Sequence, residues 1–107
     1  MSRKKRRLFT ATTPLGYSVF LERDRWRQII NHKHPAMANR LKEVQEAVVD
    51  PDIVRESTKD TTIHMYYRSS GSTYVCVVVA PANETEHFVV TTYETSNVKQ
   101  GKQLWKK

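Results

Sequence analysis

The sequence predicts an α+β fold in which one β-strand and two helices pack on an antiparallel sheet of about four strands. Two observations predict it. Apolar residues between Glu22 and Asp50 recur at the spacing of amphipathic helices. From Ile53 onward the period changes to two, and turn residues separate the apolar runs, as in a β-meander. Because 107 residues leave room for one hydrophobic core, we expect a single folded domain.

The first strand and both helices are expected before residue 51. The run Gly16–Leu21 is short and rich in aromatic and β-branched side chains, as strands are. Helical spacing then predicts two helices separated at Pro35, because the residue before a proline is disfavoured in the α region and proline fits the first turn of a helix. The apolar positions of the two helices are Trp26, Ile29, Ile30, Met37, Leu41, Val44 and Val48.

The antiparallel sheet is expected to follow, with the helices on one side and the other face partly open. Successive residues of a strand point to opposite faces, so Tyr66 and Tyr67 must lie on different sides and at most one can stack on a base. The apolar run Val75–Val79 suits a central strand that is covered on both faces. The expected strands are Ile53–Val54, Ile63–Arg68, Tyr74–Ala80 and His87–Glu94.

Positive charge is concentrated at the two ends of the chain, whose net charge is +7. Five basic residues lie in the first seven positions and four follow Val98, whereas the segment between them holds nine Lys and Arg against all eleven Asp and Glu. We therefore expect a flexible basic arm over residues 1–15 and a folded, nuclease-like domain over residues 16–107. The basic run is a solubilising tail, an arm that binds nucleic acid or a nuclear-localisation signal.

Several kinds of site are disfavoured by the residues that are missing. The three glycines stand far apart, so there is no Gly-rich phosphate loop, and neither HExxH nor paired cysteines indicate zinc. Asp50, Asp52, Glu56 and Asp60 flank a proline-containing junction and indicate a solvated turn rather than a magnesium site. We therefore expect neither a metal nor another cofactor.

The cellular compartment is predicted from two features. No stretch approaches the roughly 18 consecutive apolar residues that a membrane span needs, and Thr10, Thr12, Thr13 and Pro14 interrupt the segment that follows the basic start. The single cysteine, Cys76, lies in an apolar run, which fits a reducing compartment. We expect a cytoplasmic protein that does not bind membranes.

Metal-free RNA cleavage requires few groups from a protein. The RNA supplies its own 2′-hydroxyl as the nucleophile, so the protein needs to assist proton transfer and to stabilise charge on the phosphate. Histidine titrates near neutrality, and Arg, Lys, Thr and Tyr can contact a phosphate. The chain places such residues at the ends of its predicted elements, namely His32, His34, Arg68, Thr91, Thr92, Tyr93, Lys99 and Lys102.

Three segments carry a resemblance to a known family: Trp26–Ile30, Lys33–Met37 and Val48–Val54. In order and spacing they resemble the start of phage- and toxin-associated nuclease domains of the barnase–EndA–colicin–RelE-like superfamily. The likeness continues after Ile63, where the family has strands similar to the ones expected in this chain. The family also often ends in a segment similar to Gly101–Trp105. It spans the chain from about Phe20 to Trp105, and the order and spacing together carry it.

The resemblance implies a RelE- or barnase-like fold and a small metal-independent endoribonuclease, often a toxin restrained by an antitoxin or immunity protein. It implies His34 as general acid or base and Arg68 with Lys102 as phosphate stabilisers. It also implies Thr91 and Tyr93 as ligands of a phosphate or base. The residues expected to contact RNA elsewhere are Arg3, Lys4, Lys5, Arg6, Arg7, Lys99 and Tyr66.

Three alternatives remain open at this point. The side chain of His34 can cap the second helix beside Pro35 instead of acting in catalysis, and Trp105 is expected to close the core, with stacking on a base as the alternative. The whole domain can also be a non-catalytic RNA- or DNA-binding module, or a domain that docks another protein. The substrate of an enzyme would be messenger or transfer RNA.

Overall fold

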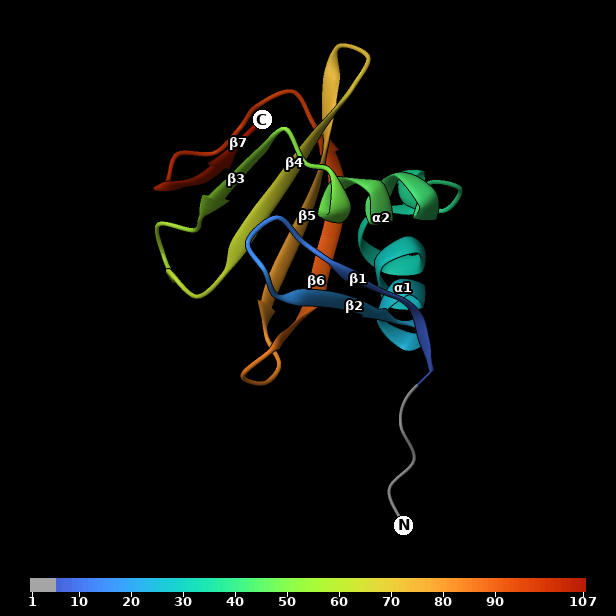
Figure 1. The fold of residues 1–107 in the computed structure, drawn as a ribbon. Coiled ribbons are helices and arrows are strands. Elements are labelled where there is room, and N and C mark those ends of the chain that lie inside the picture. The colour runs from blue at the N-terminus through green and yellow to red at the C-terminus, as the bar shows by residue number, and fades with distance from the viewer. Residues whose placement is uncertain (1–5) are drawn as a thin grey trace.

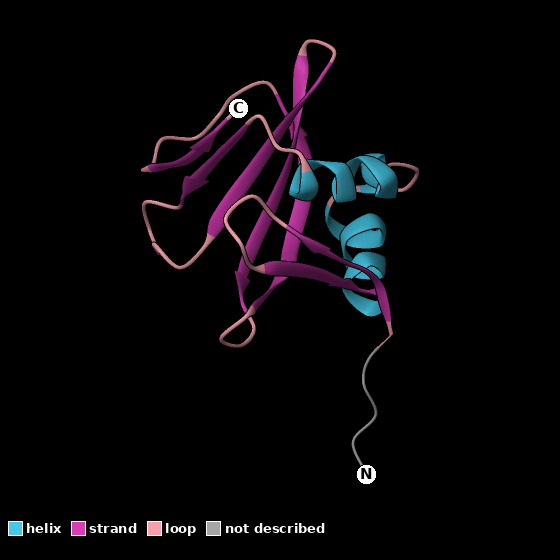
Figure 2. Cartoon of the chain, in the orientation of Figure 1, coloured by secondary structure: helices cyan, strands magenta, loops and turns pink. Residues whose placement is uncertain are grey.

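The computed structural model describes residues 6–107, which form a seven-stranded mixed sheet with helices against one face (Figures 1 and 2). The strand order across the sheet is β1-β2-β6-β5-β4-β3-β7. In chain order the elements are β1 (Arg7–Thr12), β2 (Ser18–Glu22), α1 (Arg23–Gln28), the π-helix η1 (Ile29–Lys33), the 3₁₀-helix η2 (Pro35–Met37), α2 (Leu41–Val49), β3 (Ile53–Glu56), β4 (His64–Ser70), β5 (Thr73–Pro81), β6 (Glu86–Thr95) and β7 (Gln103–Lys106).

The expected architecture of one strand and two helices on about four strands is wrong. The sheet includes β1, which lies inside the stretch 1–15 that we expected to be an arm. In β1 the buried side chains of Phe9 and Ala11 alternate with exposed Thr10 and Thr12. These threonines interrupt an apolar run but favour a strand, because β-branched side chains suit a pleated surface. The other unexpected strand, β7, is only four residues long and lies at the sheet edge.

Strand β2 is the reason why the sheet is mixed. It pairs in parallel with β6, while the other neighbouring strands pair antiparallel. The parallel ladder is short, since it joins only residues 18–20 of β2 to residues 86–88 of β6. Beyond Phe88, the helix η2 lies against β6 on this side. The second half of β6 therefore lies beside the interruption of the helical segment at Pro35 rather than beside another strand.

The helical segment has more interruptions than its apolar pattern predicts. Helix α1 passes directly into η1, where the His34 N–H donates to the Ile29 carbonyl at 2.6 Å. A bond from residue i+5 to residue i is the mark of a π-helical turn. Pro35 then begins η2, and the expected second helix starts only at Leu41 as α2. The residues on either side of His34 consequently form two tight helical turns beside β6.

Apolar side chains are sorted onto the two sides of the sheet. The larger core lies on the helix side, where Val77 of β5, Val44 of α2 and Tyr66 of β4 are fully buried. A smaller cluster on the opposite side contains Tyr67 and Cys76. We call this opposite side the outer face; it is formed by Met65, Tyr67, Tyr74, Cys76, Val78 and Tyr93.

Three smaller observations complete the fold. Tyr66 and Tyr67 lie on opposite faces, as alternation predicts, but both have an exposed fraction of 0%. Trp105 on β7 has an exposed fraction of 38%, so the expectation that it closes the core is wrong. None of the helices formed within residues 6–107 has the length and apolar character that a membrane span requires.

Candidate functional site

A pocket of about 500 Å³ lies where the second half of β6 meets the turns around Pro35. It exists because β2 pairs with only the first residues of β6, which leaves the later part of β6 beside η2. We call it the His34 pocket. It is lined by Lys33, His34, Pro35, Ala36, Met37, Thr73, Tyr93, Glu94, Thr95 and Ser96.

His34 is held between the two helical turns by its backbone. Its N–H donates to Ile29, and its carbonyl oxygen accepts from the Met37 N–H at 3.0 Å. Its side chain makes no capping hydrogen bond at η2, so the alternative that the imidazole caps a helix beside Pro35 is wrong. The half-buried imidazole lies beside the Tyr93 ring, with the ring centroids 5.4 Å apart. Among the described residues, no capping bond therefore keeps the imidazole from acting in the pocket.

Tyr93 and Thr91 project onto the outer face, but their oxygen atoms are buried. Neither hydroxyl has an ordinary hydrogen-bond partner among the described residues. The Tyr93 hydroxyl faces the Cys76 thiol, which is only a weak hydrogen-bonding group. Burial raises the pKa of Tyr93 well above its usual value, so the phenol stays neutral. The structure thus brings the Tyr93 ring to His34 but does not present either hydroxyl to a ligand.

Glu94 and Lys33 are residues of the pocket that the sequence did not indicate as functional. The Glu94 carboxylate accepts hydrogen bonds from the Thr73 hydroxyl and, at 3.0 Å, from the Arg40 guanidinium. The bond from Thr73 and the attraction of Arg40 hold the pKa of Glu94 below its ordinary value, so the carboxylate is ionised at neutral pH. A lone glutamate at the end of a strand gave no signal, because its partners Arg40 and Thr73 are distant in the sequence.

Two lysines add positive charge near this pocket. Lys33 belongs to its lining. The ammonium of Lys99 lies 5.8 Å from the centroid of the Tyr93 ring, a cation–π arrangement. The backbone N–H of Lys99 donates to the Tyr67 hydroxyl at 3.1 Å, which ties the segment before β7 to the outer face. Of the predicted residues, His34, Tyr93 and Lys99 therefore come together.

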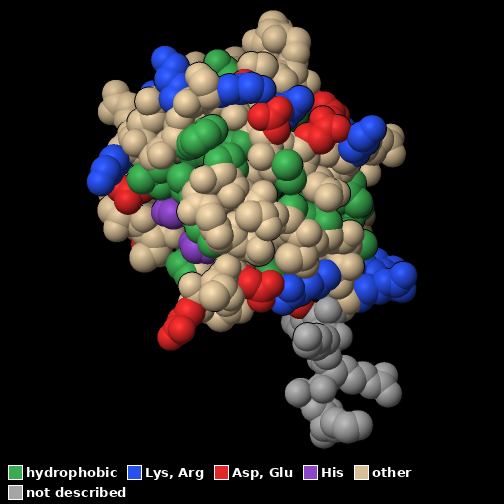
Figure 3. All heavy atoms as spheres, in the orientation of Figure 1, with side chains coloured by type: hydrophobic (Ala, Val, Ile, Leu, Met, Phe, Trp, Pro, Cys, Tyr) green, Lys and Arg blue, Asp and Glu red, His purple; other side chains and the backbone are tan. Residues whose placement is uncertain are grey.

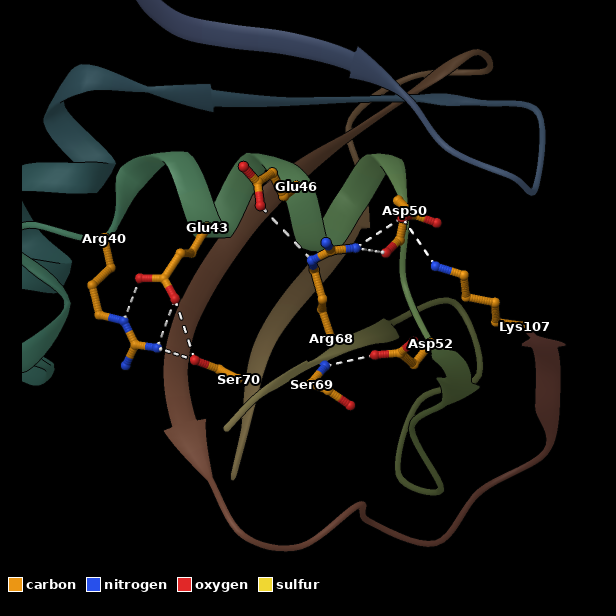
Figure 4. A network of polar contacts seen from close by, with 9 residues as sticks. All are labelled: Arg40, Glu43, Glu46, Asp50, Asp52, Arg68, Ser69, Ser70 and Lys107. Carbon is orange, nitrogen blue, oxygen red and sulfur yellow. Dashed lines mark hydrogen bonds and ion pairs between the residues drawn. The ribbon is translucent and has the colours of Figure 1, made fainter. Parts of the chain in front are cut away.

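Arg68, a predicted phosphate stabiliser, lies elsewhere, between α2 and β4 (Figure 4). One of its terminal nitrogens donates to the carbonyl oxygen of Asp50 at 2.7 Å and to its carboxylate at 2.9 Å, and Glu46 lies 3.8 Å from Nε. Lys107 of the terminal segment also contacts the Asp50 carboxylate, at 3.1 Å. The guanidinium thus connects the end of α2 to the sheet through hydrogen bonds and ion pairs.

The same figure shows a second fastening at the start of α2. Arg40 forms a two-bond ion pair with Glu43, at 2.7 and 3.0 Å, and donates to the Ser70 hydroxyl. Since Arg40 also contacts Glu94, it connects α2 to the His34 pocket. Helix α2 is therefore anchored at both ends by arginines, and one of these anchors also positions a carboxylate of the candidate site.

The remaining predicted RNA contacts are scattered. Tyr66 is buried on the helix side, and Lys102 is exposed beside β7, where its carbonyl accepts from the Glu56 N–H. Arg7 pairs with Glu86 at 2.7 Å and lies over the Phe20 ring. Arg6 is exposed. Arg3, Lys4 and Lys5 lie outside the described residues. On the face shown in Figure 3, basic and acidic side chains are interspersed rather than gathered into one basic patch.

A separate aromatic and histidine cluster lies at the other end of β6. The Tyr66 hydroxyl donates to the Tyr17 hydroxyl at 2.6 Å, and the Tyr17 oxygen is 2.7 Å from Nδ1 of His64. The ring of Tyr17 also stacks on His87, with centroids 3.8 Å apart. Burial lowers the pKa of both histidines, so this cluster favours neutral imidazoles. It joins the turn between β1 and β2 to the sheet.

No three His, Cys, Asp or Glu side chains within residues 6–107 gather where they could hold a metal ion. No family model, curated protein or solved structure matches the chain. The resemblance to the nuclease superfamily therefore rests on the sequence segments alone and stays an expectation. The groups of the His34 pocket that can perform chemistry are the imidazole, the carboxylate and the neighbouring cations.

Proposed function

We propose that this protein is a small metal-independent endoribonuclease whose active site is the His34 pocket. One observation carries the proposal: His34, which carries an imidazole, Glu94, whose carboxylate is held in its ionised form, and Lys33 line the same pocket. A proton donor, a proton acceptor and a cation are the groups that transesterification at an RNA phosphate requires.

The reaction would proceed by internal attack of the RNA on its own phosphate. Glu94 takes the proton of the 2′-hydroxyl while the O2′–P bond forms, and the P–O5′ bond breaks. His34, as imidazolium, gives its proton to the departing 5′-oxygen. The products are a 2′,3′-cyclic phosphate and a free 5′-hydroxyl, and no other reactant is consumed. Lys33 and Lys99 lie where they can offset the charge that develops on the phosphate.

Three further residues act as positioning residues. Thr73 and Arg40 hold the Glu94 carboxylate, and Arg40 is itself fixed by Glu43 at the start of α2. The ring of Tyr93 supports the His34 imidazole from the outer face. Catalytic groups perform best when neighbouring contacts restrict their orientation. In this proposal Arg68 and Lys102 have no catalytic part, because neither lines the His34 pocket.

The substrate and partners follow from charge. A chain with a net charge of +7 attracts polyanions, and messenger or transfer RNA in the cytoplasm is the proposed substrate. An inhibitory antitoxin or immunity protein would need to cover the His34 pocket. An acidic protein would suit this role, since Lys33 and Lys99 lie beside the pocket.

The test is cleavage of total cellular RNA by the purified protein in EDTA. Two variants remove the proposed acid and base, His34→Ala and Glu94→Gln. Two matched controls remove the same residue types at exposed positions that do not line the pocket, His32→Ala and Glu84→Gln. We expect fragments ending in 2′,3′-cyclic phosphate from the wild type and both controls, and almost none from His34→Ala or Glu94→Gln.

Two results would contradict the proposal. If RNA stays intact with the wild-type protein, even in the presence of translating ribosomes, the chain is not this kind of nuclease and is a binding or docking domain. If RNA is cleaved but the two pocket variants keep wild-type rates, cleavage occurs elsewhere on the molecule or comes from a contaminant.

A further inference from the structure

A second pocket lies between the turn that joins β3 to β4 and the segment that precedes β7. It has a volume of about 250 Å³. We call it the Lys59 pocket. It is lined by Ser57, Thr58, Lys59, Met65, Lys99 and Gln100.

The lining of the Lys59 pocket suits an anion. The described residues that line it carry two ammonium groups, two hydroxyls and an amide, and none of them carries a carboxylate. Two larger pockets in the described part of the chain do contain carboxylates, from Glu94 in one and from Glu46 and Asp50 in the other. Two acids flank the lining residues in sequence: Asp60 directs its carboxylate to the N–H and hydroxyl of Thr62, and the charge of Glu56 acts on its cross-strand partner His64. Hydrogen-bond donors and cations without a competing carboxylate favour a phosphate.

Both walls of this pocket are held in place. On one side, the Lys99 N–H donates to the Tyr67 hydroxyl, and the Lys99 carbonyl accepts from Arg55, both at 3.1 Å. On the other side, the Ser57 N–H donates to Ile63 at 2.9 Å, and the Lys59 N–H donates to the Ser57 hydroxyl at 3.3 Å. A preformed site loses less entropy when it binds a ligand. The backbone on both sides of the pocket is therefore held by hydrogen bonds.

Lys99 connects this pocket to the candidate active site. It lines the Lys59 pocket, and its ammonium lies over the ring of Tyr93, which lines the His34 pocket. Met65 of the Lys59 pocket and Tyr93 both belong to the outer face. A strand of RNA bound at His34 can thus pass Tyr93 and Lys99 before it reaches Lys59.

We propose that the Lys59 pocket binds a phosphate of the RNA strand that is cleaved in the His34 pocket. This inference rests on the proposed function and extends it, because it defines the substrate as an oligonucleotide with a phosphate beyond the scissile one. Lys59, with Lys99 and the hydroxyls of Ser57 and Thr58, holds that phosphate. The protein consequently binds oligonucleotides more tightly than dinucleotides.

Binding of a 2′-O-methyl oligonucleotide, which cannot be cleaved, tests the inference without requiring catalysis. Fluorescence anisotropy at several salt concentrations compares the wild type with Lys59→Gln, with Lys59→Arg and with the exposed control Lys42→Gln from α2. Each phosphate neutralised on a single strand contributes about 0.7 to the slope of log K against log salt. We expect Lys59→Gln to raise Kd several-fold and to lower the slope by about 0.7, while the other two variants retain wild-type slopes.

The outcomes separate this inference from the proposed function. Equal slopes for Lys59→Gln and the wild type, or no oligonucleotide binding by the wild type, would overturn the phosphate site even if RNA is cleaved. If the salt slope of binding depends on Lys59 but the protein leaves RNA intact, the phosphate site is supported and the proposed nuclease activity is contradicted. With an active enzyme, Lys59→Gln should raise KM for an oligonucleotide and leave kcat/KM for a dinucleotide unchanged.

Discussion

The imidazole of His34 lies beside the ring of Tyr93, with centroids 5.4 Å apart and the planes tilted by 34°. The two residues come from a turn between helices and from the last long strand of the sheet, and they meet because β2 covers only the first residues of β6. The Tyr93 hydroxyl points away from solvent and is buried near Cys76. The ring rather than the hydroxyl of Tyr93 therefore supports the imidazole.

Substitutions at Tyr93 should separate the ring from the hydroxyl. We expect Tyr93→Phe to retain RNA cleavage within a few-fold of wild type, because the buried hydroxyl has no ordinary partner to lose. Tyr93→Leu should lower kcat by at least tenfold, since His34 then has no ring beside it. Single-turnover cleavage rates measure both effects. A large loss in Tyr93→Phe would mean that the hydroxyl reaches the phosphate after all.

The pH profile of cleavage should respond to Thr73. The Thr73 hydroxyl is the strongest influence that lowers the pKa of Glu94, followed by Arg40. A base is active only when deprotonated, so activity should persist below the ordinary pKa of a glutamate and fall as the pH drops through the lowered value. Thr73→Val raises the pKa of Glu94 toward normal.

The acidic limb of kcat/KM should therefore move to higher pH in Thr73→Val. Thr62→Val is the matched control, because Thr62 bonds the exposed Asp60 in a turn that does not line the His34 pocket. An acidic limb that stays in place in Thr73→Val would show that a group other than Glu94 is the base.

Arg68→Ala should reduce stability rather than catalysis. Its guanidinium bonds the backbone and side chain of Asp50 at the end of α2, so its removal leaves that helix end without a fastening to β4 (Figure 4). We expect Tm to fall by a few degrees while the cleavage rate of the folded protein stays near wild type. Thermal unfolding followed by circular dichroism and single-turnover cleavage measure the two quantities. If Arg68→Ala loses cleavage while its Tm equals that of the wild type, Arg68 belongs to the active site.

Gly101 should be intolerant of any side chain. A Cβ at this position would collide with the carbonyl oxygen of Glu56, a backbone atom of β3 that cannot swing aside. Gly101→Ala should therefore detach β7 and lower the free energy of unfolding more than Gly71→Ala. Gly71 has a φ of +62° but nothing within 4 Å of a Cβ, so alanine there should cost only about 1–2 kcal/mol. Urea unfolding of both variants compares the two costs, and equal losses would contradict the predicted clash.

Stability should decline on mild acidification because of His64. The Tyr66 hydroxyl donates to Tyr17, so the Tyr17 proton is directed to Nδ1 of His64, which must then be unprotonated. Burial lowers the pKa of His64 against the opposing charge of Glu56, and the nearby His87 is also shifted down. The pKa of His64 in the unfolded chain is about 6.5. The stabilisation by neutral His64 is therefore complete above that pH, and it is lost as the pH falls toward the lower pKa of His64 in the folded protein.

Urea unfolding between pH 5 and pH 7.5 measures this loss. His64→Gln should flatten the decline below about pH 6.5, whereas the exposed control His32→Gln should leave it unchanged. A wild-type stability that does not change across this range would contradict the neutral form of His64 in the folded protein.

Local sequence patterns determined where several elements lie. Aromatic and β-branched runs predicted the strands that became β2, β4, β5 and β6, and Pro35 correctly marked a break in the helical segment. These features depend on residues that are near one another in the chain, so propensity and periodicity can detect them. The residue types of the candidate site were visible in the same way, and His34 at the break was among them.

The tertiary structure alone decided how these pieces combine. The parallel pairing of β2 with β6 joins distant segments, and no local pattern specifies such a partner. A β-bulge between Val78 and Val79 changes the register, so that Val89 faces the helices whereas Thr91 and Tyr93 face the other side. Simple alternation would have placed all three on one face.

The site shows the same division. The sequence contained His34, Tyr93 and Glu94, but only folding brought Arg40 and Thr73 to Glu94 and committed Arg68 to Asp50. Charge and hydrogen-bonding capacity belong to a residue type and can be known from the chain. Which groups become partners depends on distances across the sheet, and these are set by the packing of the whole domain.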